Sequence, residues 1–433
     1  MRGRPAAAAP ALALALVVLA ACTGGGGPPH ESPTASPPGP AIVGSAAEAM
    51  ARLCRRPPVN LPSAQPAKHV PDVIVETEHQ VEAVRQLQYR HPVAVEAVTR
   101  KGLIAGIDQE FAHSFPVGQT DRRNIAWQTI GVIPKQTDLE GVVHQYLSSQ
   151  VIGYYDPATK GLRYIGTENP TPIQRFVLAH ELTHALDDQH FGLRRLNDIE
   201  NGCQDEELEA ATGAVEGSAV YFSSQVLTRF FTSRDQNAVS TNRPVLLTGV
   251  PQFLINLLQW PYGDGTSFIN ALVRRGGVEA VNRALRDLPV STEQVIHPGK
   301  YPGDVPVPLD IPDLGPKLGD GWHDLDVEAI GEQWLSDMLG LQLDPLQAEP
   351  AAAGWDGGLY RAWRHGARSV VVMKTAWDTQ SDAQEFARAM SDWLSGRPTA
   401  VVRQDQAGET VTVLFASDAT TYRTLTKAAL EAG

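Results

Sequence analysis

Two histidines and a glutamate fall within five residues, in the stretch His180-Glu181-Leu182-Thr183-His184. This is the H-E-x-x-H pattern, in which both histidines lie on one face of a helix and can bind the same ion. Glu181 is rotated about 100° from His180, so its carboxylate can reach a water molecule that the ion activates without binding the ion. Because Zn²⁺ lowers the pKa of water towards 7, the pattern predicts a zinc-dependent hydrolase with Glu181 as general base. The alternative is a pair of core histidines, but this set is costly to bury without a metal.

The residues around the motif predict one long helix. Thr171, Pro172 and Gln174 form a start signal, with a threonine cap, a proline at the first helical position and a glutamine at the third. Apolar residues then recur along one side, and Gly192 marks the stop. The motif therefore lies in the middle of a largely buried helix.

A catalytic zinc site needs a third protein ligand and one open position. A second helix, predicted from Asp205 to Leu227, offers Glu209 and Glu216, which are seven residues apart and so near one face. Glu216 is flanked by small and apolar residues, and a buried glutamate without a partner is costly, so we favour Glu216 as the ligand. Glu209 follows an acidic run that is typical of a solvated helix face, and it is the alternative. His190 lies six residues after His184, off the metal face, and is predicted to be structural.

With these residues in place, the sequence resembles the gluzincins, the thermolysin-like class with H-E-x-x-H on one helix and a glutamate ligand on the next. More closely, it is similar to a family of bacterial exported gluzincin-like proteins, few of which have an assigned function. The matching segments are residues 153–157, 179–186, 188–191, 215–217, 291–301 and 354–358. The resemblance implies a zinc metallopeptidase that holds one Zn²⁺ with His180, His184 and Glu216 and hydrolyses peptide bonds.

One position departs from the pattern of these relatives. They often carry an aspartate two places after the ligand glutamate, where this chain has Ser218. Such an aspartate orients a ligand histidine through a hydrogen bond, and a serine can do so only as a neutral partner. Asp187 or Asp188 could serve instead.

Hydrolysis also calls for a donor that stabilises the developing oxyanion, typically a histidine or a tyrosine. His297 and Tyr301, in a proline-rich stretch, are the candidates, with loop packing as the alternative role. Tyr221 is predicted to be a core residue.

The N-terminal residues predict export and a lipid anchor. Arg2 and Arg4 precede an apolar run over residues 6–20, as in a secretory signal peptide. The run ends in Leu19-Ala20-Ala21-Cys22, which resembles a bacterial lipobox and implies a signal peptide over 1–21 with lipid on Cys22; ordinary cleavage nearby is the alternative. The glycine- and proline-rich stretch that follows, placed at 22–60, predicts a flexible tether that holds the protein outside the cytoplasm on the cell membrane.

Two further cysteines remain, Cys54 and Cys203. In an oxidising compartment an even pair suggests one disulfide, and two free buried thiols are the alternative. Neither cysteine lies near a second cysteine or histidine at ligand spacing, which argues against zinc binding by these residues.

Charge and length exclude one class of partner and suggest two domains. The chain has 36 Lys and Arg against 49 Asp and Glu, a net charge of −13, so nucleic acid is not an expected partner. After the tether, the length suits two domains, which we place at 61–310 for the metallopeptidase and 311–433 for a small C-terminal module.

The expected fold class is α+β, with a mainly helical zincin-like domain that carries a small mixed sheet. We expect helical structure over 70–115, short strands at 130–133, 151–157 and 162–165, and helices at 253–260, 265–274 and 278–288. The strands at 151–157 and 162–165 are predicted to form a hairpin ahead of the metal helix. In zincins an edge strand there holds the substrate backbone, although a structural hairpin is an equal alternative.

The C-terminal module is predicted to be a small α+β unit. Strands are expected at 360–363, 369–373, 399–403 and 410–415, and helices at 382–394 and 419–432. Four tryptophans gather in this module: Trp355, Trp363, Trp377 and Trp393. They are expected to form its core, with a carbohydrate or peptide platform as the alternative.

Three functional hypotheses follow. The first is a membrane-anchored, extracytoplasmic zinc peptidase that acts on a peptide or protein in the cell envelope. The second is a degenerate zinc-binding scaffold with little turnover. The third is a metal-independent adhesion or ligand-binding lipoprotein that acts through the aromatic C-terminal module.

Overall fold

The computed structural model describes residues 41–55, 70–114, 118–166, 169–242, 248–404 and 408–431. The predicted signal peptide, Cys22 and most of the predicted tether lie outside these ranges. Among the described helices, none combines the length and the apolar character that a membrane crossing requires.

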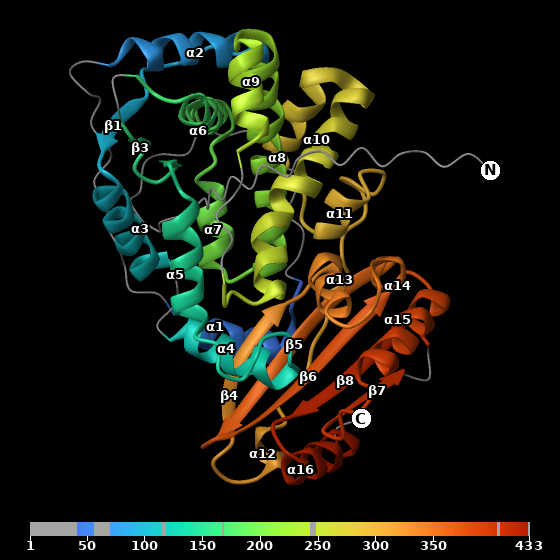
Figure 1. The fold of residues 1–433 in the computed structure, drawn as a ribbon. Helices are drawn as coiled ribbons and strands as arrows, with labels where there is room; N and C mark the ends of the chain where they lie inside the picture. The colour runs from blue at the N-terminus through green and yellow to red at the C-terminus, as the bar shows by residue number, and fades with distance from the viewer. Residues whose placement is uncertain are drawn as a thin grey trace.

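The first two-thirds of the chain is mainly helical (Figure 1). Its helices are α1 (Gly44–Leu53), α2 (Asp72–Arg85), α3 (Arg100–Ser114), α4 (Gln119–Ile130), α5 (Leu139–Gln150), α6 (Pro172–Phe191), α7 (Arg195–Asn201), α8 (Asp205–Phe230), α9 (Ser233–Ser240), α10 (Gln252–Arg286) and α11 (Thr292–Ile296). A small sheet has the strand order β1 (Ala94–Val98), β3 (Gly161–Ile165), β2 (Gly153–Asp156). β1 is parallel to β3 and β2 is antiparallel to it, so the predicted hairpin is present and β2 is an edge strand.

The C-terminal part is built on one five-stranded antiparallel sheet in the order β4-β5-β6-β8-β7. Its elements are α12 (Gly315–Leu318), β4 (His323–Ala329), α13 (Glu332–Gly340), α14 (Pro345–Ala352), β5 (Trp355–His365), β6 (Arg368–Trp377), α15 (Gln380–Trp393), β7 (Ala400–Gln404), β8 (Thr410–Ala416) and α16 (Ala419–Leu430). Together with the helical part, this sheet confirms the predicted α+β class.

Helices cover both faces of this sheet. On one face, side chains of α13 and α15 share a core with Trp127 of α4 and Phe253 of α10, so the sheet packs against the helical part. On the other face, α1, α12 and α16 pack against the sheet. The four tryptophans are at most 2 % exposed. This confirms that they are core residues and argues against the alternative, a platform that binds a carbohydrate or a peptide.

Part of the predicted tether is folded. Ile42 pairs with Leu309, the backbone nitrogen of Ala46 donates to Asp310 at 2.8 Å, and Ala46 and Ala49 are fully buried. Residues 41–55 therefore belong to the fold, because the small apolar residues of α1 recur at helical spacing and fit against β4. A disulfide joins Cys54, directly after α1, to Cys203, directly before α8, with a Cα–Cα distance of 6.0 Å.

Three further sequence predictions are wrong in detail. The stretch 70–115 is not continuously helical, because β1 interrupts it and pairs with β3 over the full length of both strands. Residues 130–133 form no strand; Ile130 ends α4, and Gly131 adopts a left-handed φ of 95° as its cap. The three helices predicted between 253 and 288 are two, because α10 continues through Pro261 and breaks at Gly276 and Gly277.

The backbones of helices α8 and α10 come into direct contact at three glycines, Gly213, Gly217 and Gly265. A Cβ on Gly265 of α10 would overlap the carbonyl oxygen of Gly213, and one on Gly217 of α8 would overlap the carbonyl group of Gly265. These glycines therefore set the distance between the two helices.

Replacing Gly265 with alanine is expected to lower the free energy of unfolding by about 1 to 3 kcal/mol, because two backbones must move apart. A Cβ on Gly263, which lies on the same helix, would meet no atom within 4 Å. Gly263→Ala is thus the matched control, expected to be neutral or stabilising by up to about 1 kcal/mol. Denaturant unfolding of both variants checks this; equal effects would show that the close contact is not a constraint.

Candidate metal centre

The helix that carries the motif begins and ends at the predicted residues. The Thr171 hydroxyl accepts from the backbone nitrogen of Gln174, the Gln174 side chain accepts from the backbone nitrogen of Thr171, and Pro172 starts the helix. Gly192, with a φ of 71°, caps the C-terminus. Residues Phe176 to Asp188 are buried throughout, so α6 is a core element of the helical part.

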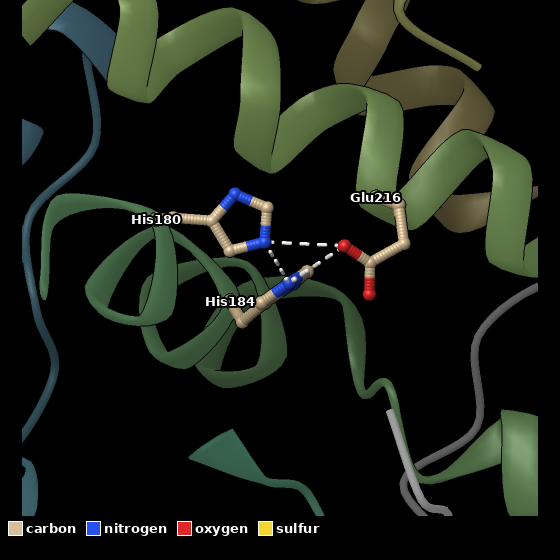
Figure 2. Close-up of side chains that lie close together, drawn as sticks. All are labelled: His180, His184 and Glu216. Carbon is tan, nitrogen blue, oxygen red and sulfur yellow. Dashed lines mark hydrogen bonds and ion pairs between the residues drawn. The ribbon is translucent and has the colours of Figure 1, made fainter. Parts of the chain in front are cut away.

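His180, His184 and Glu216 converge on one point between α6 and α8 (Figure 2). The Nε2 atoms of the two histidines are 3.0 Å apart, and Glu216 Oε2 lies 3.1 Å from His180 Nε2 and 3.4 Å from His184 Nε2. The three side chains are at most 3 % exposed. The structure thus brings together the three residues that the sequence singles out as ligands.

The spacing of these three atoms fits a small tetrahedral ion. Bonds of about 2.0 to 2.1 Å at tetrahedral angles place neighbouring ligand atoms about 3.3 Å apart, close to the observed separations. Hydrogen bonding alone accounts poorly for the triangle, because three atoms this close cannot all be joined by linear N–H bonds. The donor set of two imidazoles and one carboxylate is the one that zinc accepts in hydrolytic sites.

The charges of the cluster favour a cation at its centre. Burial by itself raises the pKa of Glu216, but His184 and the hydrogen bonds from both imidazoles outweigh this and bring the pKa to about 2. Burial lowers the pKa of His180, as expected for a neutral imidazole ligand. Glu216 in turn raises the pKa of His184 to about 9, so a protonated His184 neutralises the ionised carboxylate when no ion is bound, and a bound cation would replace that proton.

Glu181 points towards the hairpin rather than into the triangle. Its Oε2 accepts a hydrogen bond from the backbone nitrogen of Tyr155 in β2 at 2.7 Å, and its Oε1 is buried with no hydrogen-bonding partner among the described residues. Burial raises the pKa of Glu181 well above its ordinary value. The free edge of β2 thus faces α6 and positions one oxygen of this carboxylate.

Neither ligand histidine is oriented by a second residue. The Nδ1 atoms of His180 and His184 are buried and have no hydrogen-bonding partner among the residues described. Ser218 donates to Asp187 Oδ2 at 2.8 Å instead, and Asp187 Oδ1 accepts from Arg85 Nε at 2.6 Å. The departure at Ser218 therefore completes a buried ion-pair network and leaves the histidines without the orienting carboxylate that such sites usually have.

Asp188 also has a different role from the predicted one. Its Oδ2 accepts from the hydroxyl of Tyr155 and from the ammonium of Lys160, each at 2.6 Å, and its Oδ1 accepts from the backbone nitrogen of Leu193. It anchors the hairpin to the end of α6. His190 is structural as predicted, with Nε2 2.8 Å from the carbonyl oxygen of Gln88.

Two residues of the site carried no signal in the sequence. The ring of Tyr262, on α10, lies beside that of His180, with 6.3 Å between centroids. Arg85 of α2 is fully buried and pairs with Asp187, which is 102 residues away in the sequence. Long-range packing alone brings Tyr262 and Arg85 to the cluster.

Tyr221, which the sequence predicted to be a core residue, is partly buried and packs edge-on against Phe222.

Glu209 does not join the metal cluster. It lies two turns before Glu216 on α8 and lines a cavity between α4, α8 and α10. Burial raises its pKa well above the ordinary value, so the solvated face predicted for this residue is wrong.

His297 and Tyr301 are engaged elsewhere. His297 Nε2 is 2.9 Å from Glu332 Oε1, and the hydroxyl of Tyr301 donates to the carbonyl oxygen of Asp287 at 2.6 Å. Both follow α11, and α8 runs between α11 and α6 (Figure 1). Their contacts support the packing role rather than oxyanion stabilisation.

Beside His297 lies a group of buried carboxyls. Glu206 Oε1 accepts from the backbone nitrogen and the hydroxyl of Thr292 at 2.6 and 2.8 Å. Burial, together with the nearby Glu332 and Glu293, raises the pKa of Glu206 to about 8. The folded protein therefore keeps a proton on Glu206 that the unfolded chain releases near pH 4.5.

This raised pKa predicts that Glu206 lowers stability as the pH rises from about 4.5 through about 8. Glu206→Gln removes the titration but keeps the oxygen that Thr292 bonds. The melting temperature of the variant relative to the unmodified protein should therefore increase between pH 5 and pH 8.5. The exposed Glu385→Gln on α15 is the control, and an equal trend in both variants would contradict the assignment.

The geometry of the cluster predicts about one equivalent of zinc in natively purified protein. Glu216→Ala should lose the metal, whereas Glu209→Ala should retain it, because only Glu216 reaches the two Nε2 atoms. Elemental analysis by mass spectrometry measures both. Zinc loss in Glu209→Ala with retention in Glu216→Ala would overturn the ligand set.

Comparisons with known proteins identify no activity for this arrangement. Residues 323–426, which run from β4 into α16, match a family described as a domain of unknown function (DUF8575). Among solved structures, the chain is similar to the crystal structure of a putative hydrolase with a novel fold from Chloroflexus aurantiacus. That similarity has 16 % identity and a TM-score of 0.36, and covers 59 % of this chain and 96 % of the other. No curated protein matches.

Proposed function

We propose that this protein is a metal-dependent hydrolase, and more narrowly a zinc-dependent peptidase of the gluzincin type. The observation that carries the proposal is the convergence of His180 Nε2, His184 Nε2 and Glu216 Oε2 at separations of 3.0 to 3.4 Å. Zinc held there would polarise a carbonyl group and lower the pKa of water towards 7. The proposal places the protein outside the cytoplasm, anchored through Cys22, on the sequence of its N-terminus alone.

The chain supplies a base beside the three ligands. Glu181 follows His180 directly, and the backbone of Tyr155 holds its Oε2, so Oε1 is the oxygen left to accept a proton. Burial raises the pKa of Glu181 well above its ordinary value, and a cation held by the three ligands would favour the ionised carboxylate, which is the form that accepts a proton. Tyr262, beside His180, replaces His297 and Tyr301 as the candidate donor to the developing oxyanion.

Glu181→Gln should lower peptide cleavage by a factor of about 10² to 10⁴ without loss of zinc, because the amide cannot take the proton. Cleavage of a peptide library, followed by mass spectrometry, measures this. Glu385→Gln, on the exposed side of α15, is the matched control and should cleave like the unmodified protein. Equal turnover by Glu181→Gln and the unmodified protein would exclude Glu181 as the base.

One observation favours a second function, a zinc-binding scaffold with little turnover. The ligand side chains are at most 3 % exposed, whereas a hydrolytic site needs a position that substrate can reach. In that case the purified protein would contain zinc and cleave no member of the library.

A further inference from the structure

A cavity of about 320 Å³ lies where the helical part meets the C-terminal sheet. Residues of α4, α5, α8 and α10 form most of its wall, and Glu328 of β4 and Trp334 of α13 close it. The wall is mainly apolar, with Leu257, Leu258 and Pro261 on the α10 side. A chain of methylene groups would find favourable surroundings there.

The charged groups of this cavity are unbalanced. Its described lining includes four acidic side chains, Glu200, Asp205, Glu209 and Glu328, and one basic side chain, Arg123. Arg123 pairs with Asp205 at 3.3 Å and with Glu328 at 3.1 Å, so it neutralises that end of the cavity. Burial raises the pKa of Glu328 to about 8, so Glu328 adds little negative charge at neutral pH. Glu209 lies outside the ion pairs of Arg123 and is the carboxyl group that a cationic ligand would meet.

Within the part of the lining that the structure describes, Glu209 is a half-buried acidic residue without a counter-ion, and its Oε1 atom is the buried part of its carboxyl group. Its Oε1 has no hydrogen-bonding partner among the described residues, an arrangement that costs free energy unless a ligand satisfies it. Burial first, and then the neighbouring Glu206 and Asp337, raises its pKa well above the ordinary value. An ammonium group beside Glu209 would favour the ionised carboxylate and donate a strong, charge-assisted hydrogen bond to it.

One residue of the cavity wall lies next to the cluster of His180, His184 and Glu216. Tyr262 lines the cavity, and its ring lies beside that of His180. Glu209 and Glu216 are seven residues apart on α8, which corresponds to about 10 Å along the helix axis. A lysine side chain extends roughly 6 Å from its Cα on a four-carbon stem. The Glu209 side chain covers part of the remaining distance, so a lysine close to the bond at the metal would bring its ammonium group near Glu209.

We propose that this cavity binds an aliphatic chain that ends in a primary amine, with Glu209 as its counter-ion, and that it receives a lysine side chain of the substrate. The amine site follows from the cavity itself. The assignment to a peptide substrate rests on the proposed function.

Hexylamine and hexanol, which share a six-carbon chain, test the amine site by calorimetry on the natively purified protein at pH 7. Hexylamine should bind at least about tenfold more tightly than hexanol, because only the amine pairs with Glu209. Glu209→Gln should abolish that preference and leave hexanol binding unchanged. Glu207→Gln, a neighbour on α8 that does not line the cavity, is the control and should keep the preference.

Equal binding of the two probes, or a preference for hexylamine that survives Glu209→Gln, would overturn the proposal. If Glu209→Gln does not fold, Leu257→Phe, which narrows the cavity, should weaken both probes in parallel; unchanged binding would place them elsewhere. Cleavage of paired peptides that carry lysine or norleucine separates this inference from the proposed function. Amine binding without any cleavage refutes only the peptidase, and cleavage without preference for lysine refutes only the substrate assignment.

Discussion

The close approach of α8 to α10 is the constraint on which the site depends. Gly213 and Gly217 recur four residues apart on α8 and lie against the backbone of α10 at Gly265. Because the two backbones meet at these glycines, α8 is fixed in rotation as well as in distance. Glu216, which is one residue before Gly217 and about 100° from it around the helix, is thereby directed towards α6 and its histidines (Figure 2). The same rotation places Glu209, two turns earlier, at the wall of the cavity.

Buried charges then hold the helices in register. Arg85 lies between the rings of Phe191 and Phe222 and bonds Asp187 of α6 and Asn282 of α10. Removing one partner of such a buried ion pair strongly lowers the free energy of unfolding, so substitutions in this network are expected to destabilise the fold. Ser218 joins the network through Asp187, so it supports the packing of α6 against α8 rather than the imidazoles. The site is thus rigid in its backbone while the histidine side chains lack outer support.

Local patterns in the sequence predicted the elements that they encode. The capping box of α6, its glycine stop, α8, and the hairpin of β2 and β3 all depend on residues a few positions apart. The strand β1 could not be recognised in this way, because its parallel partner β3 is more than sixty residues away. For the same reason the hydrogen bond from Tyr155 to Glu181, and the position of Tyr262 beside His180, were not predictable. The choice of Glu216 over Glu209, by contrast, was predicted from the small and apolar residues that flank Glu216, and the structure brings Glu216 to the two histidines.

The burial of the metal cluster and the polarity of the cavity bear on the same question, namely how a substrate would reach the site. The ligands are covered in this conformation, yet the cavity beside them is wide enough for a side chain and lies along the face of α8 that leads to Glu216. Tyr262 separates the two, and a tyrosine ring can turn about its side-chain bonds at far lower cost than a helix can move. A side chain that occupied the cavity would press on this ring next to His180. Access to a metal held by His180, His184 and Glu216 would then depend on the group bound near Glu209. Binding of the substrate side chain and exposure of the metal would occur in the same step.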